Sequence, residues 1–232
     1  GRIFALESMG LVDGPGIRAV VFLKGCRLRR RFCHTPDSFC GEGGEWITEE
    51  DLEARILRFR PYFERSGGGV TFSGGEPLLQ AEFVAELFKE CHKRGINTCL
   101  DTSGSIINES VEKLLEHTDR VLLDIKYTTD EDYIRYVGCS IENPLKFLDY
   151  LNKQKIPTTV RQVIIPTLND SKENILRLKN IIKDYNCIDK VELLPFKKIC
   201  QVKYDNMGIT FPFGDIPEPT PDQMAKLNNM MK

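Results

Sequence analysis

Long apolar runs, a signal-peptide pattern and an excess of charge of one sign are all missing from this sequence. No apolar run approaches the about 20 residues that a transmembrane helix needs, so a membrane span is not expected. No secretory signal pattern opens the chain. The formal net charge is −2, so no overall field would draw the protein to nucleic acid or to an anionic membrane. We therefore expect a cytoplasmic protein that binds neither.

Low-complexity stretches and linker-like segments are also missing. The chain has 232 residues, of which 41% are hydrophobic and 28% are charged, and these values are typical of a globular protein. A chain of this length has room for one substantial α/β domain. The sequence therefore predicts a single domain over residues 1–232.

The chain contains many cysteines, but nothing in the sequence indicates the oxidising compartment in which disulfides form. The chain has eight cysteines and no secretory signal, so we expect reduced thiols. Cys91 lies on the apolar face of a predicted helix and Cys99 lies inside a predicted strand, where a thiol packs as a small hydrophobe. Cys26, Cys33 and Cys40 differ, because they crowd into fifteen residues of a loop rich in glycine and arginine.

Strand-like and helix-like segments alternate along the chain. The predicted strands are short and apolar without strict alternation, as expected for a parallel sheet covered by helices. About six strand–helix units fit either an open doubly wound sheet or a curved partial barrel. Residues 198–219 lack periodicity and are expected to form an irregular lid or wrap. The predicted strands cover 17–24, 70–72, 97–101, 120–126, 158–165 and 190–196, and the predicted helices cover 47–63, 80–94, 108–117, 144–154, 171–184 and 221–231, with Thr48 and Thr220 as N-caps.

Polar residues collect where the predicted strands end. Asp101 follows one strand, Asp124 and Lys126 end another, Gly74-Gly75-Glu76 ends a third, and Arg161 lies within a fourth. In parallel α/β folds, functional sites assemble at the carboxyl ends of the strands. Because isolated charges inside strands are costly, their recurrence at equivalent places predicts one shared polar pocket.

Six segments carry a family resemblance. The loop after the first predicted strand reads GCRLRRRFCHTPD over 25–37. The others are VDGPGIR at 12–18, SGGGVT and SGGE within 66–76, LDTSG at 100–104, LDIK at 123–126 and ELLPF at 192–196. Together and in this order they resemble the radical S-adenosylmethionine superfamily, and within it the activating enzymes of glycyl-radical enzymes. The resemblance runs nearly end to end and implies an α/β fold, the partial (β/α)6 TIM-like barrel of that superfamily.

The resemblance implies a specific chemistry. In that family, three cysteines spaced CxxxCxxC hold a 4Fe–4S cluster, and its open iron binds the amino and carboxylate groups of S-adenosylmethionine. Reductive cleavage of S-adenosylmethionine then yields a 5′-deoxyadenosyl radical that removes a hydrogen atom from a glycine of the partner. The cofactor, and not a side chain, therefore performs the difficult chemical step. The implied protein is a monomeric oxidoreductase that activates a glycyl-radical enzyme such as pyruvate formate-lyase, with flavodoxin or ferredoxin as electron donor. The lack of extra ferredoxin-like cysteines favours that partner.

The same resemblance implies roles for individual residues. No side chain is expected to perform the chemistry, which belongs to the cofactor radical. Asp13 would face the incoming glycyl peptide, and Cys26 and Cys33 would bind the cluster. The implied S-adenosylmethionine site comprises Phe32, Cys33, His34, Gly74, Gly75, Glu76, Asp124, Ile125, Lys126 and Arg161, and the implied monovalent-cation site comprises Asp101, Thr102 and Asp124.

Arg30 stands where the middle cysteine of the cluster motif belongs. Arginine is always protonated and has no lone pair to give iron. Three explanations stay open: a sequencing error, an engineered change or a recent loss, since one base separates some Cys and Arg codons; a third thiolate from Cys40; or a degenerate relative that kept the fold and lost the cluster. Two milder departures are Thr35, where the family usually has Asn, and Lys197, where it often has His.

Two other functions fit the same residues. A chain without a cluster could dock the partner enzyme or S-adenosylmethionine without turnover. Alternatively, Cys33, His34 and Cys40 could form a zinc site, since Cys and His are zinc's usual ligands. Arg27 and Arg29 are expected to form an ordinary solvated basic surface under every explanation.

Overall fold

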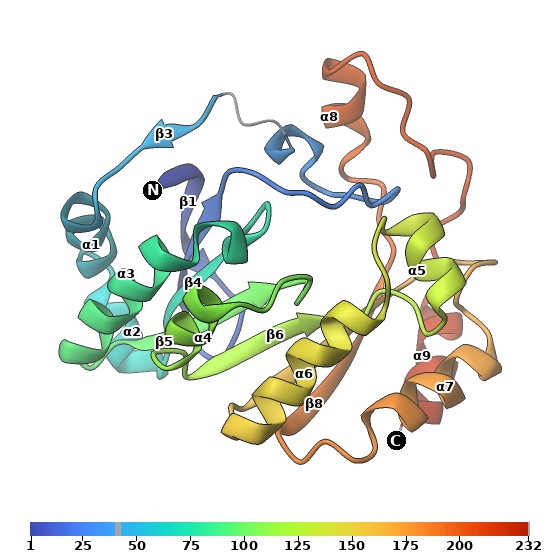
Figure 1. Ribbon diagram of the computed structural model, residues 1–232. Helices are drawn as coiled ribbons and strands as arrows, with labels where there is room; N and C mark the ends of the chain where they lie inside the picture. The colour runs from blue at the N-terminus through green and yellow to red at the C-terminus, as the bar shows by residue number, and fades with distance from the viewer. Residues whose placement is uncertain (40–42, 232) are drawn as a thin grey trace.

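One eight-stranded sheet runs through the protein (Figure 1). The structure is a computed structural model that describes residues 1–39 and 43–231. Six parallel strands pair in the order in which they occur in the chain, and two antiparallel strands extend one edge, which gives the order β3-β1-β2-β4-β5-β6-β7-β8. The strands are β1 (Arg2–Gly10), β2 (Arg18–Leu23), β3 (Glu45–Trp46), β4 (Gly69–Gly74), β5 (Asn97–Thr102), β6 (Arg120–Asp124), β7 (Thr158–Ile164) and β8 (Ile188–Pro195).

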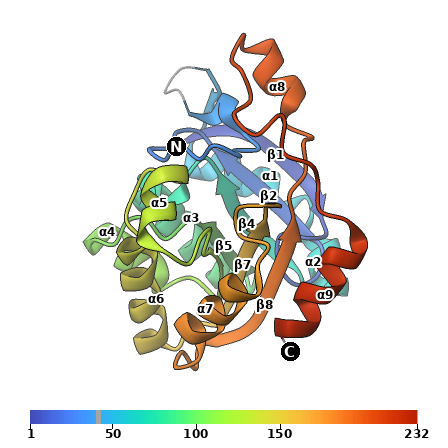
Figure 2. The ribbon, with the colours of Figure 1, turned by 90° about the vertical axis from the view of Figure 1, so that its right-hand side faces the viewer.

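This strand order separates the two architectures that the sequence left open. A doubly wound sheet reverses its strand order at a switch point, so that helices cover both faces. Here the order never reverses among the parallel strands, and helices α3, α4, α6 and α7 lie on the outer side of a curved sheet (Figure 2). The predicted partial (β/α)6 barrel is therefore confirmed, and the doubly wound alternative is wrong.

Helices connect successive parallel strands. Two further helices follow β8, and the first of them, α8, stands off the body in both views (Figures 1 and 2). Over the described residues, no helix is long and apolar enough to cross a membrane. The helices are α1 (Glu49–Leu57), α2 (Arg60–Ser66), α3 (Ala81–Lys93), α4 (Glu109–Leu115), α5 (Asp130–Tyr136), α6 (Glu142–Gln154), α7 (Lys172–Ile182), α8 (Gln201–Asn206) and α9 (Pro221–Met231), with short 3-10 turns at Pro36–Ser38 and Pro77–Gln80.

The helix predicted over 47–63 is two helices, which corrects the sequence analysis. Thr48 caps the first as expected, because its hydroxyl accepts from the backbone N–H of Asp51 at 3.1 Å. Helix α1 then ends at Leu57, and α2 begins at Arg60 with Pro61 in its first turn. Proline has no N–H to donate, so it starts a helix more readily than it continues one.

Two strands, β1 and β3, and two helices, α5 and α8, were not predicted from the sequence. Strand β1 pairs antiparallel with β2, and the short helix α5 lies between β6 and α6. Helix α8 interrupts the segment 198–219, which was predicted to be irregular. Helices α5 and α8 help to place the cysteine loop, as described below.

The interior is divided into two apolar clusters. The larger packs the outer helices against the sheet. The smaller lies beneath the cysteine loop and is largely aromatic, with Phe32 6.1 Å from Tyr127 and 6.0 Å from Phe213 between ring centroids. Aromatic pairs at this spacing stabilise packing beyond their buried area. The second cluster therefore ties the cysteine loop to the segments around α5 and α8.

We predict that an ion pair between β6 and β8 makes a small, pH-dependent contribution to the free energy of unfolding. Arg120 on β6 donates to both carboxylate oxygens of Asp189 on β8, and this contact lowers the pKa of Asp189. Because the pair is partly exposed, Asp189→Asn should lower the free energy of unfolding by about 0.5 kcal/mol at pH 7. A lowered pKa means that this stabilisation is present above the ordinary pKa of 3.8 and is lost as the pH falls below it.

Urea denaturation at pH 7 and at pH 3 measures this difference. Asp184→Asn, an exposed aspartate that forms no ion pair with another described residue, is the control and should change little at either pH. An Asp189→Asn effect that grows on acidification would contradict the prediction.

Candidate functional site

A cavity of about 1300 Å³ lies at the carboxyl ends of the parallel strands. Its wall combines the ends of β4 and β5 with the loops 11–15 and 30–35, and it continues along most of the length of β6, β7 and β8. The shared polar pocket expected at the strand ends is therefore present. The predicted site residues that line it are Asp13, Phe32, His34, Gly74, Asp101, Asp124, Lys126 and Arg161, and Arg30, which replaces the expected cysteine, lines it as well.

Arg161 is the centre of the first group of charges. Its guanidinium lies 3.8 Å from the Asp101 carboxylate and 3.1 Å from that of Glu192, its register partner on the neighbouring strand. Asp101 also accepts a hydrogen bond from Ser73 at 2.7 Å. Burial raises the pKa of Asp101, and the positive charge of Arg161 opposes that rise. The pocket thus keeps its acids close to fixed cations.

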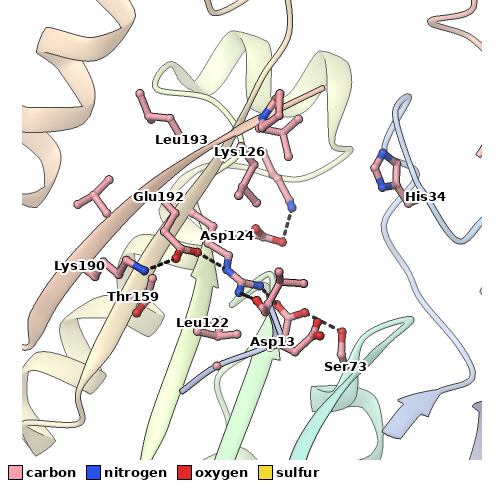
Figure 3. A pocket seen from close by; sticks show the side chains of 18 of the residues that line it. Asp13, His34, Ser73, Leu122, Asp124, Lys126, Thr159, Lys190, Glu192 and Leu193 are labelled. Carbon is pink, nitrogen blue, oxygen red and sulfur yellow. Dashed lines mark hydrogen bonds and ion pairs between the residues drawn. The ribbon is translucent and has the colours of Figure 1, made fainter. Parts of the chain in front are cut away.

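Asp124 and Lys126 form the second group. The Lys126 ammonium donates to the Asp124 carboxylate, and only 3% of the lysine side chain is exposed (Figure 3). Burial lowers the pKa of Lys126, while Asp124 works in the opposite direction. Because a buried charge is tolerated only when it is paired, the two side chains hold each other at the cavity wall.

The loop around Asp13 closes one side of the cavity. Thr71 donates to the backbone oxygen of Asp13 at 2.7 Å, and Arg161 donates to that of Val12. Burial raises the pKa of the Asp13 carboxyl, and the nearby Asp101 adds to the rise. Asp13 therefore lies on the cavity wall, and its role toward a glycyl peptide stays a prediction.

The packing of the strands requires glycine at positions 74 and 75, which was not expected from the sequence. A Cβ on Gly74 would lie 2.3 Å from the backbone nitrogen of Leu23, and a Cβ on Gly75 would lie 2.1 Å from the backbone oxygen of Gly25. Gly74 also has φ of +109°, which side chains rarely adopt. The close approach that demands glycine is thus between β4 and the end of β2, rather than only between backbone and ligand.

Glu76 faces the neighbouring strand end and is not among the residues that line the main cavity. Its buried carboxylate accepts hydrogen bonds from Thr102 at 2.5 Å, from the hydroxyl and backbone N–H of Ser103, and from Leu78 N–H at 3.2 Å. Burial raises the pKa of Glu76, and these donors oppose that rise. Glu76 and Thr102 line only a second, smaller cavity of about 70 Å³.

The remaining residues that were predicted to bind the cofactor are buried to different extents. Phe32 is buried in the aromatic cluster while still lining the cavity. His34 is exposed at the rim, with Nε2 3.2 Å from the backbone oxygen of Lys197 (Figure 3). Ile125 is fully buried and packs in the larger core. The roles of these residues toward a cofactor stay predictions.

The cysteine loop brings two thiols and one guanidinium together. Cys26 and Cys33 are both buried and unbridged, and burial raises the pKa of the Cys26 thiol. Arg30 lies between them in sequence, with its guanidinium 3.9 Å from Cys33 Sγ. Among the described residues, no group of three His, Cys, Asp or Glu side chains could hold a metal ion. Cys40, which two of the alternatives above require, lies outside the described residues.

This donor set does not fit the cluster that the resemblance implies. A site-differentiated 4Fe–4S cluster takes three thiolates, and the described part of the chain offers two. The third position carries a permanent positive charge that would repel iron. By contrast, Arg27 and Arg29 are exposed, as the sequence analysis expected.

Several lining residues were not predicted as site residues. Ser73 and Glu192 contact Asp101 and Arg161, and Ser103 holds Glu76. The signals were present, because Ser73 begins the SGGE segment and Glu192 lies between the apolar residues Val191 and Leu193 of a strand. Neither signal alone shows which neighbour the side chain meets.

Comparisons with known proteins agree with this geometry. The family model described as the Radical SAM superfamily matches residues 20–178. The pyruvate formate-lyase-activating enzyme of Clostridium pasteurianum is 47% identical over 100% of this chain and 97% of its own length. The pyruvate formate-lyase 1-activating enzyme of Escherichia coli K12 is 38% identical, with coverage of 100% and 95%.

Solved structures agree in fold. Streptococcus suis SuiB bound to S-adenosylmethionine superposes with a TM-score of 0.67 and 20% identity, over 88% of this chain and 44% of that one. At that identity the likeness supports a shared fold alone, whereas the curated relatives support common descent over the full length of the chain. The chain therefore belongs to the radical SAM superfamily and, within it, to the family of pyruvate formate-lyase-activating enzymes.

Proposed function

We propose that this chain is built to activate a glycyl-radical enzyme, most directly a pyruvate formate-lyase, with S-adenosylmethionine bound in the strand-end cavity. One observation carries the proposal. Each of the six segments that resemble the activating enzymes contributes at least one residue to the wall of this single cavity. Segments spread from residue 12 to residue 196 thus converge on one site, and the curated relatives named for this activity match the chain from end to end.

The cavity suits S-adenosylmethionine in charge and in polarity. The ligand carries a carboxylate, an ammonium and a sulfonium, and the wall offers both signs of charge. Complementary potentials favour such a ligand over a simple anion or cation. The apolar side chains of Leu122, Val163 and Leu193 supply a wall for the adenosyl part. The basic lining residues are Arg30, Arg120, Lys126, Arg161, Lys190 and Lys197, and the acidic ones are Asp13, Asp101, Asp124, Asp189 and Glu192.

The proposal also includes the finer assignments. The chain would work in the cytoplasm as one domain and as a monomer, with flavodoxin or ferredoxin as its reductant. The free thiols among the described cysteines support a reducing compartment. A monovalent cation at Asp101, Thr102 and Asp124 would compete with Lys126, because the lysine already holds Asp124.

We expect Arg30 to limit this activity, because it replaces the third cluster cysteine. The test therefore changes this residue. The chain and its Arg30→Cys variant are reconstituted anaerobically with iron and sulfide, then mixed with S-adenosylmethionine, a chemical reductant and pyruvate formate-lyase. We expect the variant to hold about four irons per chain, because it completes the three-thiolate set. It should release 5′-deoxyadenosine and produce a glycyl-radical electron paramagnetic resonance signal on the partner, whereas the parent should give little of either.

Arg31→Cys is the matched control, since it adds a thiol one position outside the required spacing. It should resemble the parent in iron content and in product. The proposal is wrong if the Arg30→Cys chain assembles its cluster and still neither cleaves S-adenosylmethionine nor places a radical on pyruvate formate-lyase.

A further inference from the structure

Arg30 differs from the other arginines of its loop in the direction that it faces. The backbone N–H groups of Arg29 and Arg31 donate to the carbonyls of Val137 and Tyr136 at the end of α5, at 3.2 and 3.1 Å. This pairing holds the loop against α5. Arg29 and Arg31 are exposed, while only 17% of the Arg30 side chain is exposed and its guanidinium lines both cavities.

The Arg30 guanidinium lacks an oxygen acceptor at hydrogen-bonding distance within the described part of the chain. Its nearest acidic oxygen, on Asp124, is 3.9 Å away, and Asp124 is already bonded to Lys126. Its only hydrogen-bond contact there is the sulfur of Cys33 at 3.9 Å, and its buried Nε has no partner. N–H to oxygen bonds are normally 2.7 to about 3.2 Å long, and buried unpaired donors are costly. The guanidinium is therefore an unsatisfied donor group aimed into the cavity.

We infer that Arg30 binds the methionyl carboxylate of S-adenosylmethionine, the group that an open iron would otherwise hold. The guanidinium presents its donors as a planar fork that matches a carboxylate in bidentate geometry. Asp124 lies beside it and can accept from the ligand's ammonium group. The inference rests on the proposed function only in taking S-adenosylmethionine as the ligand of the cavity. It goes further because it makes that binding independent of iron.

Calorimetry on chelator-treated, iron-free protein tests the inference with two probes. S-adenosylmethionine should bind to the parent chain, and Arg30→Ala should weaken that binding at least about tenfold, because hydrogen bonds to charged groups are among the stronger ones. The second probe, 5′-methylthioadenosine, shares the nucleoside but lacks the amino-acid group. Its affinity should be the same in both chains.

Two further variants separate a ligand contact from a general structural role. Arg31→Ala removes an equal charge from the exposed side of the same loop and should leave both affinities unchanged. Arg30→Lys should bind S-adenosylmethionine between the parent and Arg30→Ala. The inference is overturned if Arg30→Ala binds S-adenosylmethionine as the parent does, if both probes weaken equally, or if binding needs iron. A failure of Arg30→Cys to activate the partner would contradict the proposed function and leave this inference intact, so the two proposals can fail separately.

Discussion

Arg18→Ala is expected to lower the free energy of unfolding by about 4 kcal/mol, because it leaves several buried acceptors without a donor. Arg18 is fully buried at the start of β2. Its guanidinium donates to Thr71 Oγ1 at 3.0 Å, to Asn97 Oδ1 at 2.7 Å, and to the backbone oxygens of Val70 and Pro15 at 2.5 and 3.3 Å. One side chain thus joins β2, β4 and β5 to the loop that carries Asp13.

Urea denaturation followed by circular dichroism measures the loss. Arg55→Ala is the control, since Arg55 is partly exposed and its surface ion pair with Glu45 should add little to stability. Arg18→Lys keeps the charge and part of the reach, and should recover part of the stability. Equal midpoints for Arg18→Ala and Arg55→Ala would refute the structural role given to Arg18.

Gly75→Ala is expected to cost about 3 kcal/mol, because its Cβ would overlap the backbone. The new Cβ would lie 2.1 Å from the backbone oxygen of Gly25, which also accepts a hydrogen bond from Glu76 N–H at 2.9 Å. The loop that carries Cys26 would have to move. We therefore also expect faster labelling of the normally buried Cys26 by a thiol reagent under native conditions.

Gly67→Ala is the control that separates overlap from backbone strain. Gly67 has φ of +67°, and no atom lies within 4 Å of the position that its Cβ would take. Its substitution should cost about 1 kcal/mol from conformation alone and should not change Cys26 labelling. The explanation fails if Gly75→Ala is no more destabilising than Gly67→Ala.

The parallel strands and their helices were predictable because their signals are local. Helix α3 has an apolar stripe and ends before Gly95, and β5 follows within a few residues. Strand β1 was missed because its pairing with β2 is a tertiary contact and most of its residues are not buried. Helix α5 was missed because it is short and polar, although Thr129 and Asp132 form a capping pattern that the structure uses at 3.3 Å.

The location of the site was predictable, and its inner geometry was not. Asp101 and Asp124 lie at the carboxyl ends of the neighbouring parallel strands β5 and β6, so their proximity follows from the order of the sheet. The direction of a side chain depends instead on competing partners. Glu76 turns toward Ser103 because it finds several donors there, and Arg30 turns inward because α5 holds the backbone on either side of it.

The order of the sheet also has a consequence for biosynthesis. Each parallel strand pairs with the parallel strand made just before it, so the nascent chain can add strands one at a time as it leaves the ribosome. The contact between Arg161 and Val12 joins residues 149 positions apart. The cavity can therefore be completed only after β7 and β8 have emerged, late in translation, when most of the hydrophobic core residues have already been made.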